Sequence, residues 1–398
     1  MTNTSLRRWT ALAGVLALGA AACRGAEQQR ADSTQGAQGA QPASAVSPTP
    51  AGPLVYVTNE DGNSVTVIDA ARDSVVGTIS PGQRPRGIRV SPDGSTLIVA
   101  VSGSPKGGPG VDESKLPPPD RSKDGIAIVD RASGAVKWRL QGGHDPESFD
   151  VTPDGARIYV SNEDAGTATV LDAASRKVIA TVKVGAEPEG VETRPGGKEV
   201  WVTSEGRGTV SVIDVATNTA KATIKVGKRP RSVAFTPDGA KAYVPAEMGG
   251  TVTVVDANTY KPVKTITMPE GSRPMGSAMA PDGKRVYISN GRGGTVSVID
   301  TETDSLLTTF PVGQRPWGIA ITPDGKRLYT ANGPSNDVSV VDLATNQVVK
   351  RIPAGKSPWG IAISQKAGAR RRPGAPRPPP AGGGGGRGSG ATSSRSRP

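Results

Sequence analysis

The chain has 398 residues, a formal net charge of +12, one cysteine and one histidine. A single cysteine excludes an intramolecular disulfide, and one cysteine with one histidine excludes both a Cys/His zinc site and a C-x-x-C-H haem attachment. The sequence also lacks a G-x-x-x-x-G-K phosphate loop, and no G-x-S-x-G elbow lies near a strand-to-helix turn.

The first residues have the pattern of a secretory signal. Arg7 and Arg8 precede an apolar run over 9–22, which is shorter than the ~20 residues that a membrane span needs. The small residues before Cys23 resemble the lipobox of bacterial lipoproteins, so residues 1–23 are predicted to be a signal peptide with lipidation at Cys23. The resemblance implies an extracytoplasmic, membrane-anchored protein of the cell envelope; an ordinary cleaved signal is the alternative.

Two polar segments flank the central region. Residues 24–53 contain almost nothing apolar and are predicted to be a disordered tether. Residues 365–398 are rich in Arg, Pro and Gly and are predicted to be a disordered basic tail. Because Lys366 and seven arginines lie in this tail, the region between the two segments is close to neutral. Nucleic acid is therefore not expected as a partner, except for nonspecific contact through the tail.

Between these segments one pattern recurs seven times. Each copy has a strand with an aromatic residue and then a strand that ends in V-[IV]-D. The aspartates are Asp69, Asp130, Asp172, Asp214, Asp256, Asp300 and Asp342, with spacings of 61, 42, 42, 42, 44 and 42. A period near 42 residues built from short β-patterned runs indicates a β-propeller. Residues 54–364 are therefore predicted to form an all-β, seven-bladed propeller.

Each repeat predicts four strands. In the last copy, Arg327–Ala331 and Asp337–Asp342 alternate apolar and polar residues, as half-buried strands do. Recurring P-D-G sequences predict tight turns, and the V-[IV]-D aspartates are predicted to cap turns rather than catalyse. Since the chain starts with the aromatic strand at Leu54 and ends with the other strand type at Ser364, the last strand is predicted to close the ring inside the first blade.

The motifs Tyr56-Val57-Thr58-Asn59, Tyr159-Val160-Ser161-Asn162 and Tyr287-Ile288-Ser289-Asn290 resemble the YVTN β-propeller repeat family. The resemblance covers residues 54–364 and implies an extracytoplasmic seven-bladed propeller. It implies no single activity, because propellers of this shape include lactone hydrolases, subunits of haem and quinone enzymes, and surface-layer proteins.

The repeats differ most on one face. The second repeat carries 19 extra residues within 102–125, and long loops on a rigid scaffold are often functional. The loop of the third repeat reads His144-Asp145-Pro146-Glu147, and that of the fourth reads Glu187-Pro188-Glu189. These loops replace the arginine–proline sequences found in most other copies.

The residue after each loop proline is expected to line the mouth of the central channel. Around the ring these residues are Trp359, Arg86, Glu147, Glu189, Arg231, Met275 and Trp317. They predict an acidic arc flanked by arginines and facing an apolar arc, which suits a small ligand with cationic and apolar parts. The alternative is that the arginines and glutamates only pair with one another while the tryptophans plug the axis.

The same loops could hold a divalent cation. Asp145, Glu147 and Glu187 are hard oxygen donors suited to Ca²⁺ or Mn²⁺, and His144 is a softer donor. No other cofactor is indicated by the sequence.

Two functions remain open. The first is a binding module of the cell envelope that presents its loop-rich face to a protein, a polysaccharide or a small ligand. The second is a metal-assisted, lactonase-like hydrolase in which His144, with Asp145 or Glu147, does the acid/base work, or else an accessory propeller of a redox system. The regular repeats and the lack of a reactive constellation favour binding over catalysis.

Overall fold

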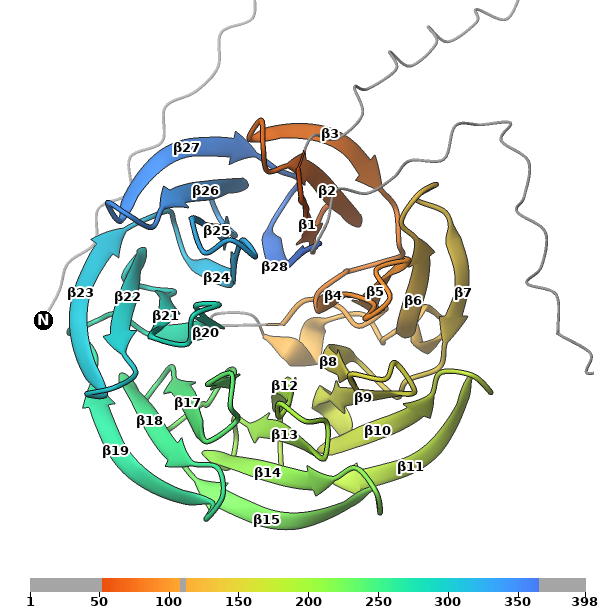
Figure 1. Ribbon diagram of the computed structural model, residues 1–398. Coiled ribbons are helices and arrows are strands. Elements are labelled where there is room, and N and C mark those ends of the chain that lie inside the picture. Colours follow the sequence, from red (N-terminus) through yellow and green to blue (C-terminus); the bar gives the residue numbers. More distant parts are fainter. Residues whose placement is uncertain (1–51, 108–111, 365–398) are drawn as a thin grey trace, which may run out of the picture. The chain divides into compact units, whose positions relative to one another are not determined.

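The computed structural model describes residues 52–107 and 112–364, and within them it is a seven-bladed β-propeller (Figure 1). Seven four-stranded antiparallel sheets are arranged around a central axis. The helices of the described residues are three short 3-10 turns, η1 (Glu113–Lys115), η2 (Arg121–Lys123) and η3 (Glu163–Ala165). None of these is long and apolar enough to cross a membrane. The predicted fold class is confirmed.

The strands of each blade are given from the axis outward. Blade 1 contains β28 (Pro358–Ile363), β1 (Leu54–Asn59), β2 (Ser64–Asp69) and β3 (Ser74–Ile79). Blade 2 contains β4 (Ile88–Val90), β5 (Thr96–Val101), β6 (Gly125–Asp130) and β7 (Val136–Leu140). Blade 3 contains β8 (Pro146–Val151), β9 (Arg157–Asn162), β10 (Thr167–Asp172) and β11 (Lys177–Lys183).

Blade 4 contains β12 (Pro188–Thr193), β13 (Glu199–Ser204), β14 (Thr209–Asp214) and β15 (Thr219–Lys225). Blade 5 contains β16 (Ala234–Phe235), β17 (Lys241–Ala246), β18 (Thr251–Asp256) and β19 (Lys261–Thr267). Blade 6 contains β20 (Pro274–Met279), β21 (Arg285–Asn290), β22 (Thr295–Asp300) and β23 (Ser305–Pro311). Blade 7 contains β24 (Pro316–Ile321), β25 (Arg327–Asn332), β26 (Asp337–Asp342) and β27 (Gln347–Pro353). The predicted signal peptide with Cys23, nearly all of the predicted tether, and the basic tail lie outside the described residues.

The last strand closes the ring as predicted. β28 pairs with β1 in antiparallel register, with Val55 opposite Ile363 and Val57 opposite Ile361. The backbone N–H of Leu54 donates to the Ser364 hydroxyl at 2.9 Å, and the backbone N–H of Ser364 donates to the Leu54 carbonyl at 2.9 Å. Closure gives β1 a hydrogen-bonded partner strand on its inner edge, which would be exposed in an open array of blades.

The apolar core lies between adjacent blades. One buried cluster, for example, joins Tyr159 and Val170 of blade 3 to Val200 and Val202 of blade 4. The second and third strands of each blade are therefore buried on both faces, where the sequence predicted half-buried strands: the four central residues of β26 are all buried. Valine alternating with serine fits this position because small hydroxyl side chains find hydrogen-bond partners within the interface.

Tyrosines at the aromatic position of the repeat link neighbouring blades through their hydroxyl groups. Tyr329 of blade 7 donates to the Asp73 carboxylate of blade 1 at 2.8 Å. Tyr159 of blade 3 donates to Asn218 of blade 4 at 2.7 Å. Each acceptor lies in the turn before the outermost strand of the next blade. The aromatic side chain at this position of the repeat therefore has a structural role.

The recurring aspartates cap turns, which confirms the prediction. Asp256 accepts hydrogen bonds from the backbone N–H groups of Asn258 at 2.8 Å and Thr259 at 3.0 Å. In the P-D-G turns, Asp238 accepts from the Ala240 N–H at 3.0 Å. These carboxylates are used by the backbone and contribute no reactive group.

Replacing Tyr329 with Phe should test the link between blades. Tyr329 is buried and its hydroxyl bonds a carboxylate, so we expect Tyr329→Phe to lower the free energy of unfolding by about 1–2 kcal/mol. Tyr287→Phe is the matched control, because Tyr287 is a buried residue whose hydroxyl has no hydrogen-bond partner within the described residues, and little change is expected. Urea unfolding measures both variants, and equal effects would contradict the role of the hydroxyl.

Candidate functional site

A strained turn precedes every innermost strand. The residue before each loop proline has a positive φ of 42° to 56°: Arg84, Asp145, Glu187, Arg229, Arg273, Arg315 and Ser357. Residues of this kind rarely adopt positive φ, and residues before proline prefer extended backbone, so each turn stores strain of ~1–3 kcal/mol. Because the conformation repeats in all seven blades, it is part of the scaffold that positions the loop residues at the axis.

The hydroxyl residue at the third position of the Tyr-Val-Thr-Asn motif holds the axis-facing residue of the next blade in place. The Thr58 hydroxyl of blade 1 donates to the Arg86 carbonyl of blade 2 at 2.7 Å. Ser161 donates in the same way to the Glu189 carbonyl at 2.7 Å, and Ser289 to the Trp317 carbonyl at 2.8 Å. A side-chain hydroxyl of one blade therefore holds the axis-facing residue of the following blade.

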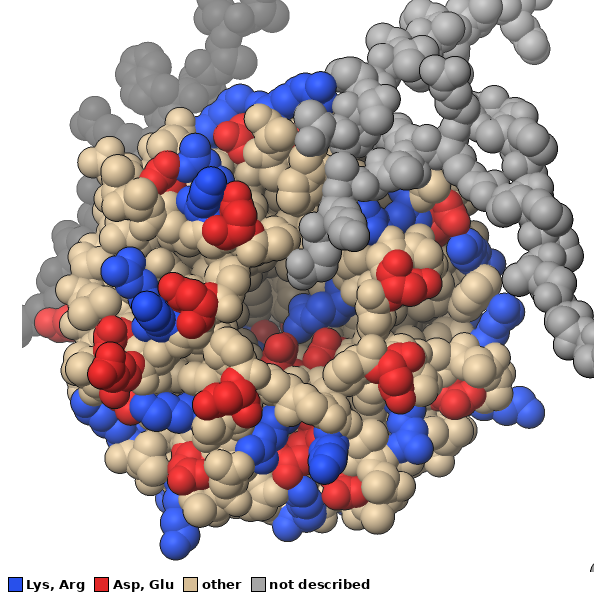
Figure 2. Space-filling model, viewed as in Figure 1, with Lys and Arg blue, Asp and Glu red and all other residues tan. Residues whose placement is uncertain are grey.

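These ring residues surround a cavity of about 790 Å³ at one end of the channel. Its walls include Arg86, Glu147, Glu189, Arg231 and Trp317, together with 104–107 and 116–119 of the blade 2 insertion. Acidic and basic side chains also lie side by side around the central opening of the ring in Figure 2. The site thus has one charged side and one aromatic side.

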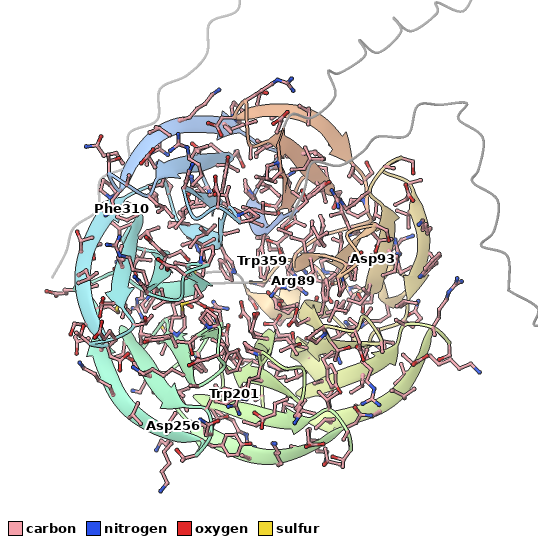
Figure 3. The ribbon with its side chains drawn as sticks, viewed as in Figure 1. Arg89, Asp93, Trp201, Asp256, Phe310 and Trp359 are labelled. Atoms are coloured by element: carbon pink, nitrogen blue, oxygen red, sulfur yellow. The ribbon has the colours of Figure 1, made fainter. Side chains whose placement is uncertain are left out.

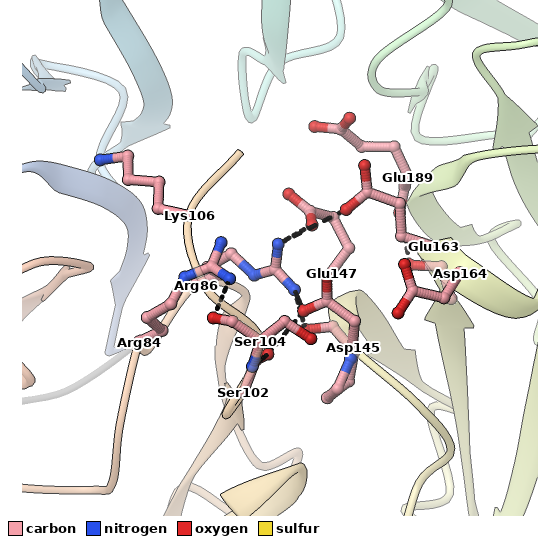
Figure 4. A network of polar contacts seen from close by, with 12 residues as sticks. Arg84, Arg86, Ser102, Ser104, Lys106, Asp145, Glu147, Glu163, Asp164 and Glu189 are labelled. Carbon is pink, nitrogen blue, oxygen red and sulfur yellow. Dashed lines mark hydrogen bonds and ion pairs between the residues drawn. The ribbon is translucent and has the colours of Figure 1, made fainter. Parts of the chain in front are cut away.

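Arg86 is the centre of the first charged network (Figure 4). It is 2% exposed, and its guanidinium pairs with Asp145 at 2.5 Å, with Glu147, and with Glu163 at 3.6 Å. Asp145 also accepts a hydrogen bond from the Ser102 hydroxyl at 2.5 Å. Such a buried charge is tolerable only because several opposite charges surround it.

Arg231 is the centre of the second network. Its guanidinium pairs with Glu189, with Glu205, and with Glu247 at 2.7 Å. The same guanidinium lies over the Trp317 ring, 4.7 Å from its centroid. This cation–π contact joins the charged side of the cavity to its aromatic side.

Two buried carboxyl groups in these networks bind protons more tightly than free glutamate does. Burial raises the pKa of Glu147 well above its usual range, although Arg86 opposes the shift and Glu163 and Glu189 add to it. Burial likewise raises the pKa of Glu189, with Arg231 opposing and Glu205 adding to the shift. For Arg86, burial acts to lower the pKa, but Glu147 and Asp145 raise it overall and keep the guanidinium charged.

The aromatic wall consists of Trp317 and Trp359. Their ring centroids are 5.4 Å apart and their planes are inclined by 32°. Both rings line the cavity and the narrower channel beneath it. The tryptophans therefore stand beside the opening, which stays accessible.

The structure brings together most of the residues that the sequence nominated for ligand binding. Eight line the cavity: Arg86, Asp145, Glu147, Glu187, Glu189, Arg231, Trp317 and Trp359. Met275 is 1% exposed and lines the channel beneath the cavity. The structure departs from the prediction at His144, which is exposed and does not line the cavity. Its neighbour Asp145 turns inward while the imidazole faces solvent.

Sequence reasoning missed a second set of acids. Glu60, Glu163, Glu205 and Glu247 follow the last residue of the repeat motif and pair with the cavity arginines. The signal was present in the internal alignment, since other copies have Gly103, Gly291 or Gly333 at this position. A turn position that alternates between Glu and Gly indicates a side-chain role in some blades only.

The structure gives the predicted divalent-cation site no support. Arg86 already pairs with both Asp145 and Glu147, and Glu187 is exposed. Within 52–107 and 112–364, no three His, Cys, Asp or Glu side chains are grouped as a metal site requires. A cation would have to displace the guanidinium from its carboxylates.

Comparisons with known proteins agree with the fold. A family model described as lactonase, 7-bladed beta-propeller, matches residues 183–351, from the end of β11 into β27. No curated protein matches the chain.

Three solved structures illustrate the similarity. Hydrazine synthase from Kuenenia stuttgartiensis is 23% identical with a TM-score of 0.62, over 77% of this chain and 99% of that chain. A Bacteroides uniformis protein proposed to be a 6-phosphogluconolactonase is 18% identical with a TM-score of 0.65, over 78% and 99%. Dihydro-heme d1 dehydrogenase is 16% identical with a TM-score of 0.55, over 77% and 74%. At these identities the structures show a shared fold.

A substitution at Thr58 should test how the ring is held. Thr58→Val keeps the shape but leaves the Arg86 carbonyl and the Gly360 N–H without their partner, so we expect a loss of about 2–3 kcal/mol in the free energy of unfolding. Thr58→Ser, which keeps the hydroxyl, is the matched control and should lose about 1 kcal/mol through its missing methyl group. The account fails if the valine variant is as stable as the serine variant in denaturant unfolding.

Proposed function

We propose that the protein is a lactonase-like hydrolase that opens small cyclic esters in the cavity at the channel mouth. The observation that carries the proposal is the pair of buried carboxyl groups, Glu147 and Glu189, each held by a buried arginine and both lining an open cavity. Such perturbed carboxyl groups in a concave site are typical of acid/base chemistry. The family-model match over 183–351 supports this choice of reaction.

The reaction needs a base, an acid and a group that stabilises negative charge. In its ionised form, one carboxylate of the pair takes a proton from water, whose oxygen attacks the lactone carbonyl carbon. The guanidinium of Arg86 or Arg231 donates hydrogen bonds to the oxyanion that forms. The other carboxyl, still protonated, gives its proton to the ring oxygen as the C–O bond breaks. Lactone and water become a hydroxy acid, and the pair has exchanged one proton.

The aromatic wall favours a sugar-derived lactone. The faces of Trp317 and Trp359 offer apolar surface to the C–H groups of a ring, while the opposite charged side offers hydrogen bonds to hydroxyl groups. A volume of about 790 Å³ lies within the range of small-molecule sites. The substrate class of the proposal is therefore a polyhydroxylated lactone.

Binding without catalysis is the second candidate. It is favoured by one observation: Asp145, Glu147 and Glu189 are already bonded to arginines, so the charged side is a closed network. In this case the cavity and the insertion would form the recognition face of an envelope-anchored propeller. Its partner would be an envelope protein, a glycan or a small ligand, or the propeller would serve a redox system.

Substitution of the carboxyl pair separates the two candidates. We expect Glu147→Gln and Glu189→Gln each to lower the kcat for hydrolysis of aldonolactones by about 10²–10⁴-fold, since each removes one proton-transfer group. A pH-stat assay with and without chelator measures the rate. Glu302→Gln is the matched control and should keep full activity, because Glu302 is exposed in the turn between β22 and β23 and does not line the cavity.

The pH dependence of the hydrolysis rate tests the mechanism. Hydrolysis should rise with pH as the first carboxyl of the pair ionises and fall again as the second does, giving a bell shifted above the usual range of glutamate because both pKa values are raised. Either Gln variant should lose one limb of the bell. Lactone binding by calorimetry without turnover would establish the binding module instead, and neither turnover nor binding would remove both candidates.

A further inference from the structure

A second charged cluster lies at the other end of the channel. Arg89 donates to Asp150 at 3.2 Å and to Glu192 at 3.1 Å, and Asp150 also accepts from the Thr193 N–H at 2.7 Å. Figure 3 places Arg89 at the centre of the ring near Trp359. These residues follow the ring residues of blades 2, 3 and 4 by three positions along the chain.

A β-bulge explains why two charged residues of one innermost strand both line the channel. On β12, Pro188 is opposite Ser204, and the next pair is Val191 with Val202. Three residues of β12 therefore span two residues of β13, and the extra residue rotates the strand. As a result Glu189 and Glu192, three positions apart, both face the same channel.

The channel between these two glutamates is narrow and has both polar and apolar walls. It has a volume of about 120 Å³, which is room for several water molecules at ~10–15 Å³ each. Its walls also contain Arg89 and Arg231, glycines, and apolar residues such as Ile319 and Ile361. Glu189 and Glu192 are the carboxyl groups that line it. The Glu189 side chain is 9% exposed, whereas that of Glu192 is 35% exposed.

We infer that Glu192 is a proton relay that connects the buried carboxyl of Glu189 with the solvent at the opposite end of the channel. The inference rests on the acid/base role proposed for Glu189. Ester hydrolysis releases a proton when the product acid ionises, and the mouth is then filled by product. The product carboxyl gives its proton to the ionised member of the pair, so that Glu147 and Glu189 are both protonated. The Glu189 carboxyl then passes a proton through water in the channel to the Glu192 carboxylate, which releases it to bulk solvent, and the pair again holds one proton.

The surroundings of Glu192 suit this role. Burial raises the pKa of Glu192 to about 8, with Asp150 adding to the shift and Arg89 opposing it. The groups that face it are Arg89 on β4, Asp150 on β8, and Glu189 on β12. The channel-lining residues of β20, β24 and β28 are uncharged. Near neutral pH the group can therefore both accept and release a proton.

Glu192→Gln tests the relay through kinetics. In dilute buffer we expect the variant to have a kcat that is at least about tenfold lower, an unchanged KM, and recovery of kcat on addition of small buffer bases such as imidazole, which can accept the proton in place of Glu192. Glu192→Asp, which retains a carboxyl, should keep most of the rate. A purely structural ion pair would give loss of folding or a rate that imidazole does not restore, and that result overturns the inference.

A second measurement does not need turnover. After a pH jump, time-resolved infrared spectroscopy follows the loss of the proton from the Glu189 carboxyl, identified by its absence in Glu189→Gln. The relay predicts that Glu192→Gln slows this loss about tenfold or more, and an unchanged rate overturns it. If no lactone is hydrolysed, the proposed function fails while the infrared result still decides whether Glu192 passes protons.

Discussion

The hydrogen bond from a hydroxyl of one blade to the ring carbonyl of the next is the interaction on which the site depends. Thr58, Ser161 and Ser289 each fix an axis-facing residue that belongs to a different sheet. The strained turns before the loop prolines complete this placement. Because neighbouring blades position one another, the cavity is rigid only once the ring is closed by β28.

Buried charge is the second constraint. Removing one partner of a buried ion pair typically costs ~3–5 kcal/mol, so Arg86 and Arg231 and their carboxylates must be retained together. Burial raises the pKa of Glu147 and of Glu189, and because each arginine has more than one acidic partner, the neighbouring carboxyl groups add to the shift. The same ion pairs that stabilise the buried charges thus create carboxyl groups that can exchange protons. Stability and proposed chemistry share one network.

The sequence predicted the blades, the ring closure, the capping aspartates and the position of the ring residues, because each of these follows from a short repeated pattern. Pairing between loop arginines and glutamates was the alternative drawn from the sequence, but the position of Arg86 between Asp145 and Glu147 was not predicted, since it depends on contacts between blades. His144 is exposed and the next residue, Asp145, has a positive φ, neither of which residue types alone indicate. The bulge that brings Glu192 into the channel is likewise a tertiary feature.

The central claim is that the cavity holds a protonated carboxyl group at neutral pH. Infrared spectroscopy of the protein at pH 7 measures it directly through the carbonyl stretch of a carboxylic acid. The account predicts such a band, which weakens in Glu147→Gln or Glu189→Gln and disappears at a higher pH than the band of a solvent-exposed glutamate, because burial raises the pKa of both groups. A spectrum in which every carboxyl is already ionised at pH 7 would contradict it.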